Sequence, residues 1–172
     1  MLNNPALNIS LGIENIEEKL TVDDIDRICQ AFAMIIDAKS NYTYEHSSRV
    51  AKYSVAISKK MGFDEEKIKF IYRAGLLHDI GKLGIPSSII DKPGKLTNEQ
   101  KLNGKGYHRK LKGQEINVES RILAVADVFD ALHSERPYRP AMPIEKVFKI
   151  MQEEMKEELD QNIVLTLKEI IQ

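Results

Sequence analysis

The chain of 172 residues contains a single cysteine, Cys29, and no tryptophan. One cysteine excludes an intrachain disulfide framework and is typical of a protein from a reducing compartment. The sequence also lacks an apolar run of about 18 residues, so it predicts no membrane-spanning helix. Residues 1–11 lack the basic start of a secretory signal peptide. We therefore expect a soluble cytoplasmic protein.

An excess of either charge is absent as well, because 25 lysine and arginine residues oppose 26 aspartate and glutamate residues. Net charge therefore gives no indication of a nucleic-acid or membrane partner, and we expect neither. Internal repeats and low-complexity tracts are also missing. At this length we expect one domain over residues 21–172 with a sizeable core, preceded by a loosely attached lead over residues 1–20.

Apolar residues recur at helical spacing through most of the chain, and no segment predicts a strand. Thr21 followed by Asp24 forms a capping-box pattern at the start of the first helix. Its apolar stripe consists of Ile25, Ile28, Cys29, Phe32, Ile35 and Ile36. Further helices are expected over residues 45–61, 68–77 and 118–132, then from Pro143 onward and in a short last helix ending near Ile171. The prediction is an all-α bundle of five to seven helices with Cys29 in its core.

His78 and Asp79 directly follow the predicted apolar helix of residues 68–77, and His78 continues the apolar face of that helix. A buried carboxylate needs a partner or a metal ion. One nitrogen ligand beside one oxygen ligand suits a divalent cation such as manganese, iron, nickel or zinc. The pair alone is weak evidence, because helix ends often carry histidine and exposed aspartate. His46 strengthens it from the apolar face of the preceding helix, although a lone histidine there is more often a core residue.

The most apolar helix, residues 118–132, contains Asp127 and Asp130 in its otherwise uncharged second half. An unpaired carboxylate in such a setting costs several kcal/mol or shifts its pKa. Asp127 is therefore a further candidate ligand, whereas Asp130 is expected to cap the helix or face its edge. The sequence thus predicts a cation site with four ligands, which are His46, His78, Asp79 and Asp127.

Three basic residues lie near the candidate ligands in the sequence. Lys82, three residues after Asp79, is either a cation that contacts phosphate or donates a proton, or a solvated lysine. Arg136 and Arg139 lie among prolines just after the helix of residues 118–132. Guanidinium groups suit bidentate phosphate binding, although arginines in such a loop are more often plain surface residues.

The order His46, His78-Asp79 and Asp127, each on a different helix, resembles the ligand order of the HD metal-dependent phosphohydrolases. Over about residues 37–170 the chain is similar to one branch, the HD-GYP domain. The segments that carry this resemblance are His46–Ala51, Ala74–Pro86, Lys92–Thr97, Leu111–Gly113, Arg121–Leu132 and Arg136–Pro140. That family hydrolyses the bacterial second messenger cyclic di-GMP with two or three metal ions, often iron or manganese. The resemblance implies catalytic roles for Asp79 and Lys82, and phosphate contacts from Lys82, Arg136 and Arg139.

The chain departs from the HD-GYP pattern at two places. The helical segment that normally separates Leu96–Thr97 from the glycine loop is missing, and in the family it supplies three further histidine ligands. Thr97 and Gln100 form a helix-start pattern, but almost no helical sequence follows them. The Gly-Tyr-Pro signature is Gly106-Tyr107-His108, where His108 is expected to be an exposed loop residue, with a ligand role as the alternative. The resemblance therefore implies one complete metal site and an incomplete second site.

Two functions remain open at this point. The retained ligands and Lys82 favour a phosphohydrolase with a reduced metal site that acts on a cyclic dinucleotide or another phosphate ester. The missing histidines favour a catalytically inactive HD-type binding module in second-messenger signalling. Loss of a helical segment is also expected to expose apolar surface on its former neighbours, which predicts a homodimer.

Overall fold

The computed structural model describes residues 20–39, 45–84, 115–135 and 139–172. Within these ranges every regular element is a helix, which confirms the all-α prediction. The elements are α1 (Val22–Ala38), α2 (His46–Lys60), α3 (Glu65–Leu77), the 3-10 helix η1 (Ile80–Gly84), α5 (Val118–His133), α6 (Ile144–Lys149), the π-helix η3 (Ile150–Glu154) and α7 (Gln161–Ile171). Over the same ranges, none of the helices is both long enough and apolar enough to cross a membrane. The predicted lead lies outside the described residues except for Leu20, as do Thr97, His108 and Arg136.

Side chains cap the first turns of α1 and α7. At the start of α1, the backbone N–H of Asp24 donates to the Thr21 hydroxyl, and that of Thr21 donates to the Asp24 carboxylate, as predicted. Asp160 is the N-cap of α7, and its Oδ1 atom accepts from the backbone N–H groups of Asn162 and Ile163 in the first turn. The helix that begins at Ile144 changes to π-helix at Ile150 and ends before Met155.

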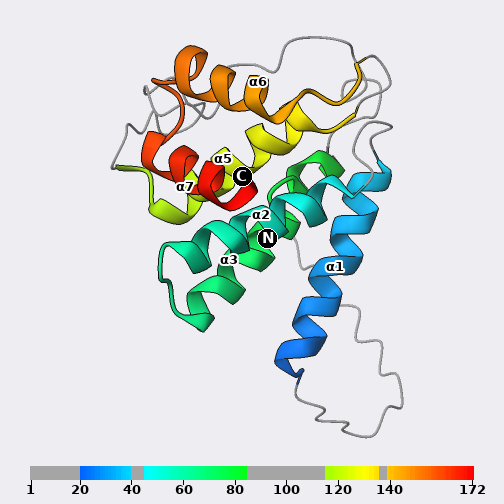
Figure 1. The fold of residues 1–172 in the computed structure, drawn as a ribbon. Helices are drawn as coiled ribbons and strands as arrows, with labels where there is room; N and C mark the ends of the chain where they lie inside the picture. Colours follow the sequence, from blue (N-terminus) through cyan, green and yellow to red (C-terminus); the bar gives the residue numbers. More distant parts are fainter. Residues whose placement is uncertain (1–19, 40–44, 85–114, 136–138) are drawn as a thin grey trace, which may run out of the picture.

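Helix α2 lies at the centre of the bundle and packs against α1, α3, α5 and α7 (Figure 1). The larger core cluster joins α2 and α3 to the C-terminal helices. Its buried residues are Ile57, Ile71, Ile122, Val125, Phe129, Val147, Phe148, Met151, Leu159, Ile163, Val164 and Leu167. A smaller cluster of Cys29, Ala33, Ala51 and Leu76 joins α1 to the α2–α3 pair. Burial of Cys29 confirms its predicted place in the core.

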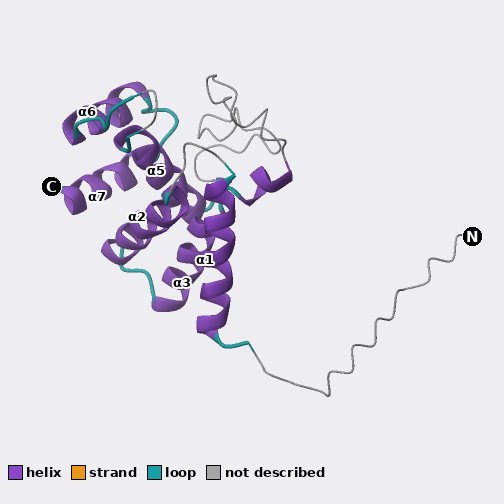
Figure 2. Cartoon of the chain, turned by 90° about the vertical axis from the view of Figure 1, so that its right-hand side faces the viewer, coloured by secondary structure: helices purple, strands orange, loops and turns teal. Residues whose placement is uncertain are grey.

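The apolar stripe of α1 is only partly covered. Its buried apolar residues are Cys29, Ala33 and Ile36. By contrast, Ile25, Ile28, Phe32 and Ile35 are 36 to 55% exposed. Figure 2 shows α1 at the edge of the bundle, where one side of the helix meets neighbours. The stripe is therefore wider than the contact it makes with the described part of the chain.

Helices α2 and α3 approach each other closely at Gly75. A Cβ atom added at this glycine would lie 2.7 Å from the Cα atom of Ala51, a distance that real Cβ atoms do not reach. Because the obstacle is backbone, the two helices would have to separate to admit a methyl group. Glycine at this position therefore sets the spacing of the two helices that carry His46 and His78.

Gly75→Ala is expected to lower the free energy of unfolding by about 1–3 kcal/mol, the usual cost of overpacking a core. Urea unfolding of the metal-free proteins measures the change. Gly84→Ala is the matched control, since a Cβ atom there meets no other heavy atom within 4 Å among the described residues. Equal stability of the Gly75→Ala variant and the parent chain would contradict the close packing of α2 on α3.

Candidate metal centre

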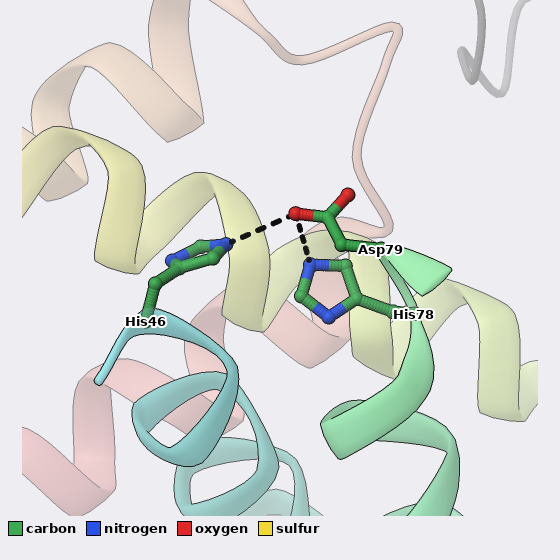
Figure 3. A group of neighbouring side chains, drawn as sticks. All are labelled: His46, His78 and Asp79. Atoms are coloured by element: carbon green, nitrogen blue, oxygen red, sulfur yellow. Dashed lines mark ion pairs between the residues drawn. The ribbon is translucent and has the colours of Figure 1, made fainter. Parts of the chain in front are cut away.

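Two segments bring polar side chains together where α2 begins and α3 ends. His46 is the first residue of α2, and His78 and Asp79 follow the last residue of α3. One nitrogen of each histidine and one oxygen of Asp79 lie within 4.8 Å of one another. The Asp79 oxygen Oδ2 is 3.4 Å from Nε2 of His78 and 3.9 Å from Nε2 of His46 (Figure 3). The geometry is that of a cluster whose donor atoms face a common point.

Asp127 of α5 approaches the same two nitrogens from another side. Its Oδ1 atom is 3.2 Å from Nε2 of His46 and 3.9 Å from Nε2 of His78. The carboxylate remains 42% exposed, so the site opens to solvent at this position. The structure therefore brings the four sequence-predicted ligands together, with His46, His78 and Asp79 as the tightest group.

The His46 ring is oriented by Asp130. Its Nδ1 atom lies 2.7 Å from Oδ2 of Asp130, a side chain that is only 1% exposed. Arg49 holds the same carboxylate in a fork, with Nε donating to Oδ1 at 2.6 Å and Nη2 donating to Oδ2 at 3.0 Å. An ionised carboxylate only accepts hydrogen bonds, so Nδ1 of His46 carries a hydrogen, and Nε2 is the nitrogen that faces the other candidate ligands. The expectation that Asp130 caps the helix or faces its edge is thus wrong.

The His78 ring is oriented by its own helix. Its Nδ1 atom lies 2.8 Å from the carbonyl oxygen of Gly75, which can only accept, so Nδ1 carries the hydrogen. The other nitrogen, Nε2, is buried and has no hydrogen-bond partner among the described residues. Buried polar atoms without a partner are rare and need an explanation. A cation bound at Nε2 supplies one, because its lone pair faces the two aspartates.

The pKa values of the site follow from these contacts. Burial lowers the pKa of His46, but its hydrogen bonds to Asp127 and Asp130 outweigh burial and raise that pKa to about 9. Burial raises the pKa of Asp130, yet hydrogen bonds from His46 and Arg49 bring it down to about 2. Burial acts likewise on Asp127, and its hydrogen bond with His46 holds its pKa below the ordinary value. Both carboxylates are therefore ionised at neutral pH, and a cation at Nε2 of His46 competes with a proton there.

Two of the predicted basic residues lie in the described part of the chain. Lys82 lies in η1 and donates from Nζ to Oδ2 of Asp79 at 2.5 Å, so it is paired beside the cluster rather than free in solvent. Arg139 donates from Nη2 to the carbonyl oxygens of Ala131 and Leu132, both at 2.8 Å. It therefore caps the C-terminal end of α5, a contact that the sequence did not predict.

The pairing of Arg49 with Asp130 was not predicted from the sequence, although the spacing of these residues from His46 and Asp127 indicates it. Arg49 follows His46 by three residues and Asp130 follows Asp127 by three, so each pair lies on one face of its helix. Two helices that face each other at His46 and Asp127 therefore also face each other one turn later. Spacing predicts the second contact once the first is accepted.

The chain matches the family described as HD domain over residues 30–101 and again over residues 96–163. It is 37% identical to 3'3'-cGAMP-specific phosphodiesterase 3 of Vibrio cholerae, over 96% of this chain and 44% of the relative. It is 32% identical to a cyclic di-GMP phosphodiesterase of Thermotoga maritima, over 74% of this chain and 44% of that protein. A crystal structure of the cyclic GMP-AMP specific phosphodiesterase V-cGAP3 of V. cholerae superposes with a TM-score of 0.65 at 36% identity, covering 88% of this chain and 42% of the other. The chain spans less than half the length of these proteins.

The same comparisons indicate an internal gap. The two stretches that match the HD domain family meet at residues 96–101, where the sequence predicted the missing helical segment. The alignment with the V. cholerae relative extends over 204 positions, but 96% of this 172-residue chain is about 165 residues. About 39 positions therefore have no counterpart here. Both observations agree with loss of part of the helical core.

Proposed function

Because the chain belongs to the HD domain family, we propose that it is a metal-dependent phosphohydrolase that cleaves a phosphodiester bond of a cyclic dinucleotide. One observation carries the proposal most directly. The buried Nε2 of His78 has no hydrogen-bond partner among the described residues and faces the oxygens of Asp79 and Asp127. Nitrogen and oxygen donors in this arrangement suit iron, manganese or a similar divalent ion.

The residues would share the work in the following way. The cation would be held by His46, His78, Asp79 and Asp127, one ion per chain. When bound, it supplies Lewis-acid polarisation of a phosphoryl oxygen and activation of water. Asp130 and the Gly75 carbonyl keep the two imidazole rings in the tautomer that presents Nε2.

Substrate binding would depend on the basic residues around the cluster. Lys82, which is paired with Asp79, would stabilise the charge that develops on the phosphate during cleavage. Arg136 and Arg139 would contact the phosphates of the dinucleotide, and the guanidinium group of Arg139 has further N–H groups besides those of Nη2, which cap α5. The remaining donors of its guanidinium group are sufficient for one phosphate contact.

The names of the relatives, which refer to two different cyclic dinucleotides, support the choice of substrate class. The V. cholerae relatives at 37% identity are named for 3'3'-cGAMP, and the T. maritima relative is named for cyclic di-GMP. The test is incubation with each compound in the presence of manganese or iron(II), with products separated by chromatography. Slow, metal-dependent formation of a linear dinucleotide is expected, and failure of both compounds to bind would reject the proposal.

The second candidate function is a binding module without turnover. It is favoured by the roughly 39 alignment positions that have no counterpart in this chain, because the HD-GYP resemblance assigns three further ligands to that segment. Binding of a cyclic dinucleotide without any product under metal-replete conditions would select this alternative. Either function is proposed to operate in the cytoplasm, which the single cysteine supports.

We further propose that two copies of the chain associate through α1. Ile25, Ile28, Phe32 and Ile35 follow one another at spacings of three, four and three residues, which is the pattern of a helix-pairing seam. All of them are more than a third exposed in the described structure. A second α1 helix would bury this seam against an identical one, as in a two-fold symmetric dimer.

Ile28→Glu is expected to turn a dimer into a monomer, because it places a charge in the middle of the apolar seam. Sedimentation and light scattering from micromolar to hundred-micromolar protein measure the change. Met34→Glu is the matched control, since Met34 is 72% exposed and lies outside the seam. A parent chain that stays monomeric over the whole range would rule out the dimer.

A further inference from the structure

Helix α2, which begins with the candidate ligand His46, lacks a cap of its own. Its N-cap residue, Glu45, has a left-handed backbone with φ of 56° and makes no side-chain capping hydrogen bond. The first backbone N–H groups of a helix have no partner within the helix and need one from elsewhere. Another part of the chain therefore has to hold the first turn of α2.

Asp37, in the last turn of α1, fulfils this role. Its two carboxylate oxygens accept from the backbone N–H of Ser47, at 3.3 Å and 3.2 Å, and Oδ1 also accepts from the Ser47 hydroxyl at 2.7 Å. The side chain is only 7% exposed. A carboxylate is unfavourable at the C-terminal end of its own helix and favourable at the N-terminal end of another. The Asp37 carboxylate therefore stabilises the N-terminal end of α2 rather than its own helix, α1.

His46 and Ser47 are neighbours in the chain, so what holds Ser47 also holds the backbone of His46. Asp130 fixes the direction of the His46 ring through Nδ1, and Asp37 fixes the turn from which the ring projects. Together they determine where Nε2 lies relative to Asp127 and Asp79. A displacement of the first turn of α2 would move Nε2 away from both carboxylates.

The C-terminal end of α1 also contacts η1, the segment that follows His78 and Asp79. Lys39 donates from Nζ to the carbonyl oxygen of Leu83 at 2.7 Å, in η1, which directly follows Asp79. The end of α1 is therefore in contact with both ligand-bearing segments. We infer that Asp37 is a positioning residue for the metal ligand His46, an inference that rests on the proposed metal site.

The experiment compares Asp37→Ala and Asp37→Asn with the control Asp26→Ala in the full chain. Asp26 lies on the same helix and accepts from Nε of Arg73 of α3 at 2.6 Å, so its loss also removes a contact of α1 without touching α2. Manganese affinity is measured by calorimetry, and hydrogen exchange of the Ser47 amide is measured by NMR in the metal-free proteins. The His46 ring resonances are recorded in the same samples.

Asp37→Ala is expected to weaken manganese binding about ten- to hundredfold, the usual effect of removing a group that orients a ligand. Asp37→Asn keeps one acceptor oxygen and is expected to weaken binding about three- to tenfold. Exchange of the Ser47 amide should accelerate in the same order, and the His46 ring resonances should shift. Asp26→Ala should lower the melting temperature and leave manganese affinity and the His46 resonances unchanged.

Unchanged Ser47 exchange and unchanged His46 resonances in the Asp37 variants would overturn the inference. Where Asp37→Ala does not fold, the Asp37→Asn result decides alone. A parent chain that binds no manganese would reject the proposed function instead, and the metal-free NMR comparison would still decide the role of Asp37. An Asp26→Ala variant with equally weakened manganese binding would show that general loosening of α1 is the cause, and would overturn the inference as well.

Discussion

Asp127→Ala is expected to abolish retention of a divalent cation by the purified protein. The substitution removes an oxygen that lies 3.2 Å from Nε2 of His46 and 3.9 Å from Nε2 of His78. Metal analysis of the purified proteins measures the loss. In the parent chain, bound manganese should also raise the free energy of unfolding by about 3 kcal/mol at a few hundred times its dissociation constant, and this increase should vanish in the variant.

Glu119→Ala provides the control for this prediction. Glu119 lies on the same helix, α5, and forms an ion pair with Lys67 at 2.6 Å, away from the cluster. Its loss should leave the metal content unchanged. Stoichiometric metal in Asp127→Ala would show that the proposed ligand set is wrong.

Turnover of a cyclic dinucleotide is expected to be orders of magnitude slower than in the V. cholerae relative assayed side by side. About 39 positions of the alignment with that relative have no counterpart here, and the HD-GYP resemblance places further metal ligands in a helical segment that this chain is expected to lack. Absence of a second ion would remove several kcal/mol of transition-state stabilisation, and about 1.4 kcal/mol corresponds to a factor of ten in rate. Single-turnover time courses with manganese or iron(II) supplied give the comparison.

Binding should survive better than turnover, because the basic residues are retained. A bidentate contact between arginine and phosphate contributes roughly 1.5–3 kcal/mol, so Arg136→Ala should weaken dinucleotide binding about tenfold or more. Arg139→Ala is a less direct test, since it also removes the cap on the carbonyl oxygens of Ala131 and Leu132. Turnover as fast as that of the relative would contradict the reduced metal site.

Much of the helical structure could be predicted from the sequence, because helix caps and the spacing of apolar residues depend on neighbouring residues in the chain. The capping box at Thr21 and the helical spacing of apolar residues both act within a few residues, and the structure contains the expected helices. The exposed stripe of α1 could not be predicted in the same way. Periodicity identifies Ile28 and Phe32 as apolar residues on one face, but it does not tell how many neighbouring helices cover that face.

The candidate metal ligands were predictable because a polar side chain on an apolar helical face needs a partner. His46, His78 and Asp127 all met that condition, and the structure brings them together. The supporting residues depend on contacts between distant segments. Asp130 meets Arg49 across 81 positions of sequence, and Asp37 of α1 meets Ser47 of α2 across 10 positions. Contacts between distant segments depend on how whole helices pack against one another. The spacing of apolar residues within one helix does not determine that packing.

A manganese titration of the metal-free chain, with release of linear product from cyclic di-GMP and from 3'3'-cGAMP followed at each addition, tests the central claim most directly. The claim is that His46, His78, Asp79 and Asp127 form the metal centre of a phosphodiesterase. We predict no product without manganese, and a slow rate that reaches its maximum when one ion is bound per chain. A rate that is independent of manganese, or one that is unchanged in His78→Ala, would contradict it.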